Sequence, residues 1–556
     1  MPITVHLHGR KDPLVCDSGI CVREVVPARD SRGYPVVAAL VNNDVASLQT
    51  RLAMNCTVRP LSVASQNGWL VFRRTVCFLL SVAAKRALPD CHLRVRHSIG
   101  CGIYATLRDA QDAPDRPVTD KEVARLRAAL TALVAEDIPI RQELCGYEES
   151  VETFAKAGQH DKVGLLQHMN APVVLLQVCG PYREIYQGAM LASTGQLTPL
   201  ELLREGDGIL AIGPSRHDPS VVAPHSINEG LMRIHREHAV WGDILGIHCV
   251  GDLNQAIADR CMTDVMQMSE ALHDKKFSQI ADEIASRRPL PRLVLIAGPS
   301  SAGKTTSCKR LGIHLRVNGL HPVMLSTDDY FVDEKDDPIG PDGKPDYEDI
   351  RAVDIAGLKA DIAALFEGKE IRRRQFDFRS KKPVWTEERI RLGDSDILCI
   401  EGIHGLNPLL TDSVPREKKF LIYLSAITQL GIDDTTILST SDNRLIRRIV
   451  RDNLFRGHNA KKTISLWPNV RRGEEKWIFP YQNEADVSFN SSLDYELSVL
   501  RPYAEALLAE VKPCDAEYAT ARRLQDVLKN FHPIPPNAVP GNSILREYIG
   551  GSVFQY

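Results

Sequence analysis

The spacing of hydrophobic and polar residues changes along the first 230 residues of the chain. Apolar and polar residues alternate over Ile3–Leu7, and an apolar run over Val36–Val41 ends at an Asn-Asn-Asp turn, so both predict strands. Apolar residues then recur at helical spacing over Val71–Leu88 and Thr119–Ala135, and Val173–Cys179 predicts a strand. The pattern favours a small β-rich unit followed by a larger α+β unit.

A different pattern fills the rest of the chain. Most apolar residues of Leu253–Ser286 follow helical spacing, which predicts one or two helices. Short apolar runs at Leu293–Ala297, Pro322–Ser326 and Ile397–Gly402 then have the length of buried strands, and Thr306–Val317 reads as a helix after the first of them. Strands that alternate with helices predict a parallel α/β sheet flanked by helices.

Length and composition set the limits of these predictions. A chain of 556 residues, 44% hydrophobic and 25% charged, is typical of a globular protein of three or four domains. The patterns divide it into four segments: a β-grasp-like domain at 1–62, an α+β domain at 63–230, a helical connector at 231–290 and an α/β domain at 291–556.

Charge and cysteine usage bear on location and partners. The net charge of −3 gives no global basic field for nucleic acid, and the thirteen cysteines include no CxxC pair. The start has no apolar signal core and no apolar run is long enough to span a membrane, so we expect a cytoplasmic protein with free thiols and no membrane partner. Homo-oligomer formation is left open.

A glycine-rich turn joins the predicted strand at 293–297 to the helix behind it. It matches GxxxxGK[ST], and we assign nucleoside triphosphate binding to Gly298, Pro299, Ser300, Ser301, Ala302, Gly303, Lys304, Thr305 and Thr306. Glycines let the backbone N–H groups wrap a phosphate, and the helix N-terminus adds a positive field. Lys304 would contact the β- and γ-phosphates and the Thr305 hydroxyl would bind Mg²⁺. The flanking strand and helix distinguish this motif from a chance match.

Two acidic side chains follow later strands of the same sheet. Asp328 comes directly after Pro322–Ser326, and Glu401 lies near the end of Ile397–Gly402. Ligands of doubly wound sheets sit at the carboxyl ends of strands, so Asp328 is placed to act as a general base toward a substrate hydroxyl. Glu401 is placed to orient Mg²⁺ or its waters. The alternative for Asp328 is a surface Asp-Asp turn.

Two polar stretches and a basic helix complete the candidate site. Val332–Ile350 is predicted to be a lid or substrate-facing loop, and the stretch at 372–379 is a second such candidate, although an FDF triplet is more often an edge strand. A helix that begins near Asp442 places four arginines on one stripe, at spacing i, i+3, i+4 and i+7: Arg444, Arg447, Arg448 and Arg451. Arginine suits phosphate recognition, and a solvated basic face is the alternative.

Together these motifs resemble the uridine kinase and phosphoribulokinase family. The shared pieces are GPSSAGKT, LSTDDYF, the QFDF stretch, IEGIHGLNP and SDNRLIRRIVRDNLFRG. The resemblance implies a P-loop kinase that transfers a phosphoryl group from ATP, with Mg²⁺, to the 5′-hydroxyl of a nucleoside, uridine or cytidine being favoured. The alternatives are a kinase for another small hydroxyl substrate, such as a sugar phosphate, and a non-enzymatic ATP-binding regulator associated with RNA or ribosomes.

The resemblance also implies a role for individual residues. Catalysis is assigned to Asp328, Lys304 and Arg447, and metal binding to Thr305 and Glu401. The lid arginines that close on ATP are Arg448, Arg451 and Arg456. The nucleoside-binding set is Asp329, Tyr330, Phe331, Tyr347, Glu348, Phe376, Asp377 and Arg444. Asp346–Asp349 departs from the animal enzymes, and Phe378 and Arg379 offer no counterpart of their pyrimidine-binding histidine, so the base stays open.

The front of the chain resembles part of another enzyme. Residues 1–62 are similar to the TGS domain of threonyl-tRNA synthetases, and 63–230 to their editing-type domain, in which HxxxH and a later Cys and His converge. Here Arg74, Phe78, Tyr186 and Met190 occupy those four positions. We therefore expect no editing and no zinc site, and a scaffolding or binding role; RNA binding by these domains stays open without positive support.

One further pair of histidines invites a metal interpretation. His235 and His238 are three residues apart and so share one face of a helix. A zinc site needs further ligands, and the sequence nominates none. We expect a solvated, charged helix face.

Overall fold

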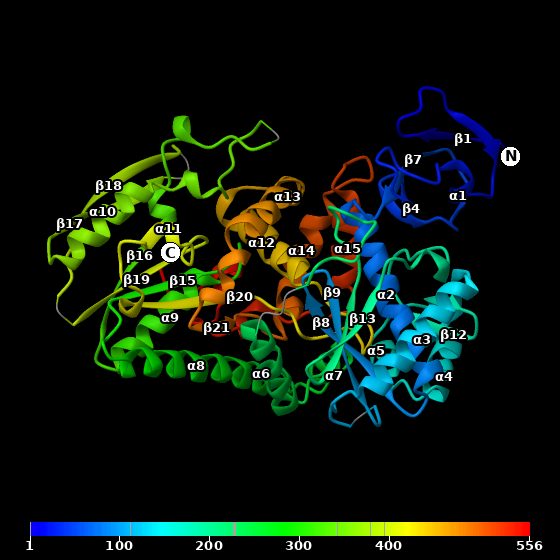
Figure 1. Cartoon of the computed structure of the whole chain (residues 1–556), viewed down its shortest axis with the longest axis horizontal. Coiled ribbons are helices and arrows are strands. Elements are labelled where there is room, and N and C mark those ends of the chain that lie inside the picture. The colour runs from blue at the N-terminus through cyan, green and yellow to red at the C-terminus, as the bar shows by residue number, and fades with distance from the viewer. Residues whose placement is uncertain are drawn as a thin grey trace.

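The computed structural model describes residues 2–111, 113–225, 229–341, 343–377, 380–393 and 395–555. Figure 1 shows a front half (residues 2–225) and a back half (residues 293–555), and the helices α12, α14 and α15 lie on the side of the back half that faces the front half. The mixed α/β class is as expected. Across these described ranges, no helix is long and apolar enough to cross a membrane.

The first unit of the front half is a five-stranded sheet of order β2-β1-β7-β4-β5, in which β1 and β7 are parallel. Its strands are β1 (Pro2–Leu7), β2 (Leu14–Asp17), β4 (Val36–Val41), β5 (Asp44–Ser47) and β7 (Cys56–Ser62). A two-stranded ribbon of β3 (Ile20–Cys21) and β6 (Arg51–Leu52) and the single helical turn α1 (Val22–Val25) cover it. The turn between β4 and β5 uses Asn42 and Asn43 at positive φ, a conformation that asparagine tolerates.

The second unit of the front half packs two helices against antiparallel sheets. The helix α3 (Asp120–Glu136) buries one face, whereas α2 (Gln66–Ala87) is buried on all sides over residues 75–84. Helix α2 begins five residues before the predicted Val71 because Ser65 caps it. The sheet β13-β14-β9-β8 has strands Glu201–Glu205, Gly208–Ile212, Gly102–Arg108 and His92–Ile99. The sheet β10-β11-β12 has strands Ile140–Gly146, Val173–Cys179 and Tyr182–Ile185, accompanied by α4 (Tyr147–Lys156) and α5 (His160–Gln167).

Three helices connect the two halves: α6 (Glu229–Leu245), α7 (Val250–Ala258) and α8 (Met262–Ser286). The long helix α8 runs along one side of the back half (Figure 1) and buries Phe277, Ile280 and Ile284.

The expectation of a solvated helix face at His235 and His238 of α6 is wrong. Both are more than nine-tenths buried, and the His235 ring stacks on His97 with centroids 3.1 Å apart. Helical spacing cannot distinguish such a buried aromatic contact from an exposed face.

The back half is built on an all-parallel sheet of order β16-β19-β15-β20-β21. Its strands are β15 (Leu293–Ala297), β16 (His321–Ser326), β19 (Asp396–Gly402), β20 (Lys419–Ser425) and β21 (Val487–Asn490). The three predicted strands are present, and their apolar runs are buried because helices cover both faces, as in other parallel sheets. The carboxyl ends of β15, β16 and β19 therefore meet at one edge.

The remaining elements of the back half surround that edge. They are α9 (Lys304–Val317), α10 (Ile355–Phe366), the hairpin β17 (Ile371–Asp377) and β18 (Lys382–Ile390), α11 (Pro408–Thr411), α12 (Thr440–Arg456), α13 (Ala460–Trp477), α14 (Glu496–Ala509), α15 (Tyr518–Leu528) and α16 (Arg546–Ile549). The basic helix α12 begins at its N-cap Ser439, close to the predicted start, and buries Leu445, Ile446 and Ile449.

One loop of the back half inserts into the front half. This inserted loop (residues 426–438) lies between β20 and α12. The backbone N–H of Val95 donates to Asp434 O at 2.7 Å, and the Tyr186 hydroxyl donates to Thr435 O at 2.7 Å. Fully buried Lys162 lies 2.8 Å from Glu184 and 3.2 Å from Asp433. The two halves are thus joined by buried polar contacts in the loop that directly precedes α12.

Candidate active site

The turn after β15 forms a close-packed phosphate loop. A Cβ at Gly298 would lie 1.9 Å from Leu424 O, so only glycine fits there, and Gly303 has φ +83 at the start of α9. The Lys304 ammonium folds back onto the loop and donates to Pro299 O at 3.3 Å. The loop has the backbone shape that its sequence predicts, with Lys304 and Thr305 in the first turn of the helix.

The first two arginines of the predicted stripe lie elsewhere than expected. Arg444 and Arg447 are fully buried and paired with the carboxylates of Glu474 and Glu496. Their guanidiniums donate to carbonyls at the back of the phosphate loop, at Ser300 and Ser301. Because they are enclosed, neither can contact a substrate or a transferring phosphoryl group in this geometry, so the roles predicted for Arg444 and Arg447 are wrong. They support the loop from behind.

The other three arginines gather around one carboxylate. Asp452 is 1% exposed, and Arg448 and Arg451 lie 3.3 and 2.8 Å from it, with Arg456 at 3.8 Å. Arg448 also donates to the Ser300 hydroxyl of the phosphate loop at 2.8 Å. The charge of Arg451 and burial lower the pKa of Arg456 to about 10. Three cations thus lie around one buried carboxylate beside the loop, and further carboxylates act on two of them.

A buried carboxylate lies where three strands of the sheet end. The Thr305 and Ser326 hydroxyls both donate to Oε1 of Glu401, at 3.1 and 3.0 Å. Burial, and then the charge of Asp328, raise the pKa of Glu401 to about 7. Asp328 itself is half-buried at the end of β16, with its backbone N–H held by the Ser326 hydroxyl at 3.2 Å. Thr305, Glu401 and Asp328 are therefore brought together as predicted.

The aromatic positions of the predicted acceptor site meet only in part. The rings of Phe331 and Phe376 contact with centroids 5.5 Å apart. Burial raises the pKa of Asp329 to about 6, although Arg373 opposes the shift, and its carboxylate faces the backbone of Phe376. Tyr347 is 40% exposed, with the Lys381 ammonium 5.9 Å from its ring centroid.

Two residues assigned to substrate binding, one in the core and one exposed, contact other parts of the fold. Tyr330 is 1% exposed, and its hydroxyl donates to Asp361 of α10 at 2.8 Å, so it faces the core and its predicted role is wrong. Asp377 lies at the end of β17, where its carboxylate accepts from the Ser380 hydroxyl at 2.6 Å and holds the hairpin turn. Phe378 and Arg379 lie outside the described residues.

Glu348, in the predicted substrate-facing loop, lies next to one of the arginines of α12. Its Oε1 lies 3.8 Å from Arg448, and burial raises the pKa of Glu348 to about 7 against that cation. The next charge that raises it belongs to Glu474, and Asp328 contributes as well. A Cβ at Gly473 of α13 would lie 2.3 Å from the Glu348 Cβ, so this glycine allows α13 to press the loop into the site.

Sequence reasoning missed the acids and the tyrosine that hold the loop in place. Glu474 accepts from the Ser300 N–H at 3.3 Å, and the Tyr548 hydroxyl donates to Ser301 O at 3.0 Å. Glu547 accepts from Thr306. These residues come from α13 and α16, and no local pattern in the sequence marks them. The only available signal was a pair of glutamates on the helix that follows the one with the arginine stripe.

The four replaced editing positions also come together, but as packing. Phe78, Tyr186 and Met190 lie in one buried cluster, with the Phe78 and Tyr186 rings edge-on at 6.0 Å. Arg74 donates to Ala189 O at 2.6 Å, and burial and Arg523 lower the pKa of Arg74 to about 10. Within the described part of the chain, no group of three or more His, Cys, Asp or Glu could hold a metal ion there or elsewhere.

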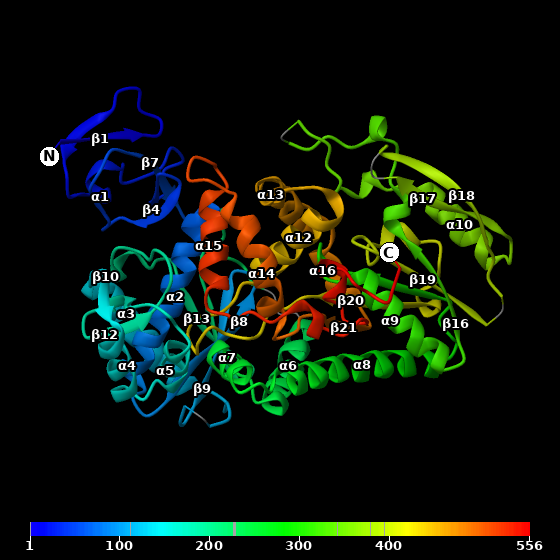
Figure 2. The ribbon, with the colours of Figure 1, turned by 180° about the vertical axis from the view of Figure 1, so that it is seen from behind.

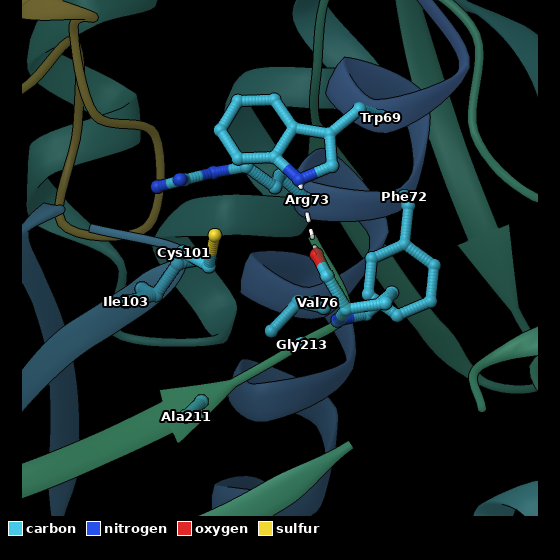
Figure 3. A pocket seen from close by; sticks show the side chains of 9 residues that line it. Trp69, Phe72, Arg73, Val76, Cys101, Ile103, Ala211 and Gly213 are labelled. Carbon is cyan, nitrogen blue, oxygen red and sulfur yellow. Dashed lines mark hydrogen bonds between the residues drawn. The ribbon is translucent and has the colours of Figure 1, made fainter. Parts of the chain in front are cut away.

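Two pockets in the described part of the front half show no catalytic geometry. One is a narrow gap between α2 and β9 that has no room for a water molecule, where Arg73 stacks on Trp69 at 4.5 Å and Trp69 donates to Pro214 O at 3.3 Å (Figure 3). The other, of about 280 Å³, lies between α2, α4 and the inserted loop. Asp161 on its wall accepts from the Gln111 amide and from the Asp434 N–H, so its oxygens already have partners.

Comparison with known proteins assigns the two halves to different relatives. The sequence profile of the Phosphoribulokinase / Uridine kinase family matches residues 293–498. A uridine kinase of Halobacterium salinarum is 26% identical over 193 residues, 34% of this chain and 76% of that protein. A threonine–tRNA ligase of Symbiobacterium thermophilum is 29% identical over 187 residues, 33% of this chain and 28% of that protein. The chain thus spans less than a third of the threonine–tRNA ligases it matches.

Solved structures include one described as "a Possible Uridine Kinase" from Bacillus stearothermophilus. It is 19% identical, covers 39% of this chain and 98% of that chain, and has a TM-score of 0.27. From the sequence matches, the C-terminal half carries a P-loop kinase domain of the phosphoribulokinase/uridine kinase family, and the N-terminal part is homologous to threonine–tRNA ligases.

Proposed function

We propose that this protein transfers the γ-phosphoryl group of ATP to the 5′-hydroxyl of a nucleoside, with uridine or cytidine favoured. The observation that carries the proposal is the meeting of three groups at one sheet edge: the phosphate loop, the Thr305–Glu401 pair and the Asp328 carboxylate. A carboxylate beside a phosphate loop can take the proton of an incoming hydroxyl. The result of such a reaction is a nucleoside monophosphate and ADP.

The residues at the loop fit a magnesium ion. Glu401 is a buried carboxylate whose raised pKa shows that no neighbouring cation fully compensates it, and two hydroxyl oxygens lie on its Oε1. Hard oxygen donors of this kind suit Mg²⁺. When bound, the ion would neutralise charge on the β- and γ-phosphates. Thr305 and Glu401 would hold it, directly or through water.

The cations around the loop suit the phosphates of ATP. Lys304 is held at the loop only by a carbonyl at 3.3 Å, so its ammonium can turn to a phosphate at little cost. Arg448 and Arg451 already lie within the Asp452 cluster and need little movement to contact phosphate oxygens. Such preorganised cations stabilise the charge that spreads over the transferring group in the transition state.

The acceptor side suits a nucleoside better than a small sugar. The Phe331 and Phe376 rings form an apolar surface against which a base can stack, and Glu348 offers a carboxyl for ribose hydroxyls. Asp328 lies close enough to both Glu348 and Glu401 for its charge to raise the pKa of each.

The decisive experiment measures ADP release from ATP·Mg²⁺ with a panel of acceptors. The panel contains uridine, cytidine, adenosine, guanosine and several sugar phosphates, and Lys304→Ala serves as the blank. We expect uridine or cytidine to stimulate release most strongly and Lys304→Ala to show none. Stimulation by a sugar phosphate alone would replace the nucleoside assignment, and the absence of any stimulated release would remove the kinase proposal.

A further inference from the structure

The last residues of the chain return to the phosphate loop. From α15 the chain crosses the back half to α16, which packs against α12 (Figure 2). There Oε2 of Glu547 accepts from the Thr306 backbone N–H at 3.2 Å and from the Thr306 hydroxyl at 2.7 Å. Thr306 occupies the third position of α9, directly after the GKT of the loop.

The neighbours of Glu547 fix it in this place. Ile544 and Tyr548 are fully buried, and the Tyr548 hydroxyl donates to Ser301 O at 3.0 Å. A Cβ at Gly303 would lie 2.6 Å from Ile544 Cγ2, so this contact depends on the glycine of the loop. Residues 541–551 thus form a C-terminal strap against the loop, and the strap holds one carboxylate at the start of α9.

That carboxylate stands where an anionic ligand of the loop would bind. The N–H groups in the first turn of a helix have no partner within the helix, and the helix dipole adds a positive field, so this end attracts phosphate or carboxylate. Glu547 uses the amide and the hydroxyl of Thr306 and lies near Lys309 and Arg451, on both of which its charge acts. A phosphate and a carboxylate cannot share these donors, because both are anions that need the same protons.

We propose that Glu547 is an internal substitute for a nucleotide phosphate, and that the C-terminal strap must leave Thr306 when the nucleotide binds. The inference rests on the proposed ATP site and adds its regulation: the strap holds the loop closed to nucleotide until phosphate displaces the carboxylate. Two glycines at positive φ, Gly550 and Gly551, follow α16 and provide a point at which the backbone can turn.

The test is the affinity of the full-length protein for ADP, measured by calorimetry without any acceptor. Glu547→Gln keeps the size of the side chain and removes its charge. We expect it to bind ADP about threefold to tenfold more tightly than wild type, the range that a charge at a helix N-terminus commands. Adenosine, which has no phosphate, should bind equally to both. Glu510→Gln, an exposed glutamate after α14, is the matched control and should not change ADP affinity.

A second readout does not depend on a variant. In hydrogen exchange of the wild-type protein, the amides of residues 541–551 should exchange faster when ADP is added and unchanged when adenosine is added. Slower exchange with ADP, or an ADP affinity of Glu547→Gln equal to or weaker than that of wild type, overturns the inference while the ATP site stands. A wild-type protein and variant that both fail to bind ADP and ATP overturn the proposed function, and the inference with it.

Discussion

Two regions of the molecule bury charged side chains, and they differ in whether those charges are compensated. In the front half, Lys162 is fully buried between Glu184 and Asp433, at 2.8 and 3.2 Å. Burial opposes the charge, but the two carboxylates raise the pKa of Lys162 well above its usual value, and Lys162 helps to lower that of Glu184 to about 2. In the back half, Glu401 has a pKa of about 7.

The difference separates structural charges from charges kept for a ligand. The cluster around Lys162 is complete, because the inserted loop of the back half supplies Asp433 and Thr435 as partners. The charges of the candidate site are not, since Asp452 faces three arginines and the charge of Lys304 does not offset the burial of Glu401. Uncompensated groups in a cleft are where substrates and ions are expected. The contacts of the inserted loop attach the front half to the segment that leads into α12, the helix that carries the arginines.

The largest expected effect is at the incomplete site. Asp328→Asn should lower the turnover of nucleoside phosphorylation by about 10²- to 10⁴-fold, because an amide cannot accept the hydroxyl proton. ATP affinity should change less than about threefold, since Asp328 holds no phosphate. The matched control is Asp336→Asn, an exposed acid in the same loop region. Turnover retained in Asp328→Asn would show that another group removes the proton.

Changes in the buried cluster around Lys162 should lower the stability of the protein and leave its catalytic activity unaffected. Lys162→Met leaves Asp433 buried without its cation and Glu184 with Lys85 as its remaining cation, and we expect the free energy of unfolding in urea to fall by about 3–5 kcal/mol. Adding Glu184→Gln to this variant should restore part of the loss.

The control for that experiment is Lys156→Met on α4, whose ion pair with Glu152 is exposed on both sides. It should change stability by no more than about 0.5 kcal/mol. Equal effects of Lys162→Met and Lys156→Met would mean that the buried cluster does not hold the inserted loop.

Short-range patterns predicted the part of the site that lies on consecutive elements. The runs at 293–297, 322–326 and 397–402 are strands β15, β16 and β19, and parallel strands necessarily bring Thr305, Asp328 and Glu401 to one edge. The resemblance to the editing-type domain likewise pointed to residues that meet, since Phe78, Tyr186 and Met190 lie in one buried cluster.

Contacts between distant elements could not be read from the sequence. Helical spacing placed Arg444 and Arg447 on the same stripe as Arg448. The later helices α13 and α14 pack over Arg444 and Arg447, where Glu474 and Glu496 pair with them. Helical periodicity does not say which side of a basic stripe meets another helix. For the same reason Tyr330, two residues after Asp328, was expected at the substrate, although Asp361 of α10 binds its hydroxyl in the core.

The catalytic activity of the candidate site should also depend on pH near neutrality. Burial and Asp328 raise the pKa of Glu401 to about 7, and metal binding requires its ionised form. The kcat/KM for ATP·Mg²⁺ should therefore rise about tenfold between pH 6 and pH 8. Glu401→Asp, a shorter carboxylate, should keep a pH dependence, and Glu401→Gln should lose the activity itself. A flat wild-type profile would contradict the raised pKa.

Stability should change with pH in the opposite direction. The folded protein holds a proton on Glu401 up to a pKa of about 7, whereas the unfolded chain releases it near 4.5. Between these values the folded state binds more protons, so this group makes the free energy of unfolding fall as pH rises, by about 1–3 kcal/mol. In urea unfolding at pH 5.5 and 7.5, Glu401→Gln should show a smaller fall than wild type. An identical fall would place the titration elsewhere.

The smallest effect is expected at Tyr186, which occupies one of the four positions that the family resemblance assigns to editing. The Tyr186 hydroxyl donates to Thr435 O at 2.7 Å inside the front half, and Tyr186→Phe removes only that hydrogen bond. We expect a loss of about 1 kcal/mol in the free energy of unfolding, because the buried carbonyl keeps no equivalent donor. The KM for ATP and the turnover should stay within about twofold of wild type, since the hydroxyl touches the inserted loop and not the lid arginines. A large fall in turnover without a loss of stability would instead make Tyr186 part of a pathway from the front half to α12.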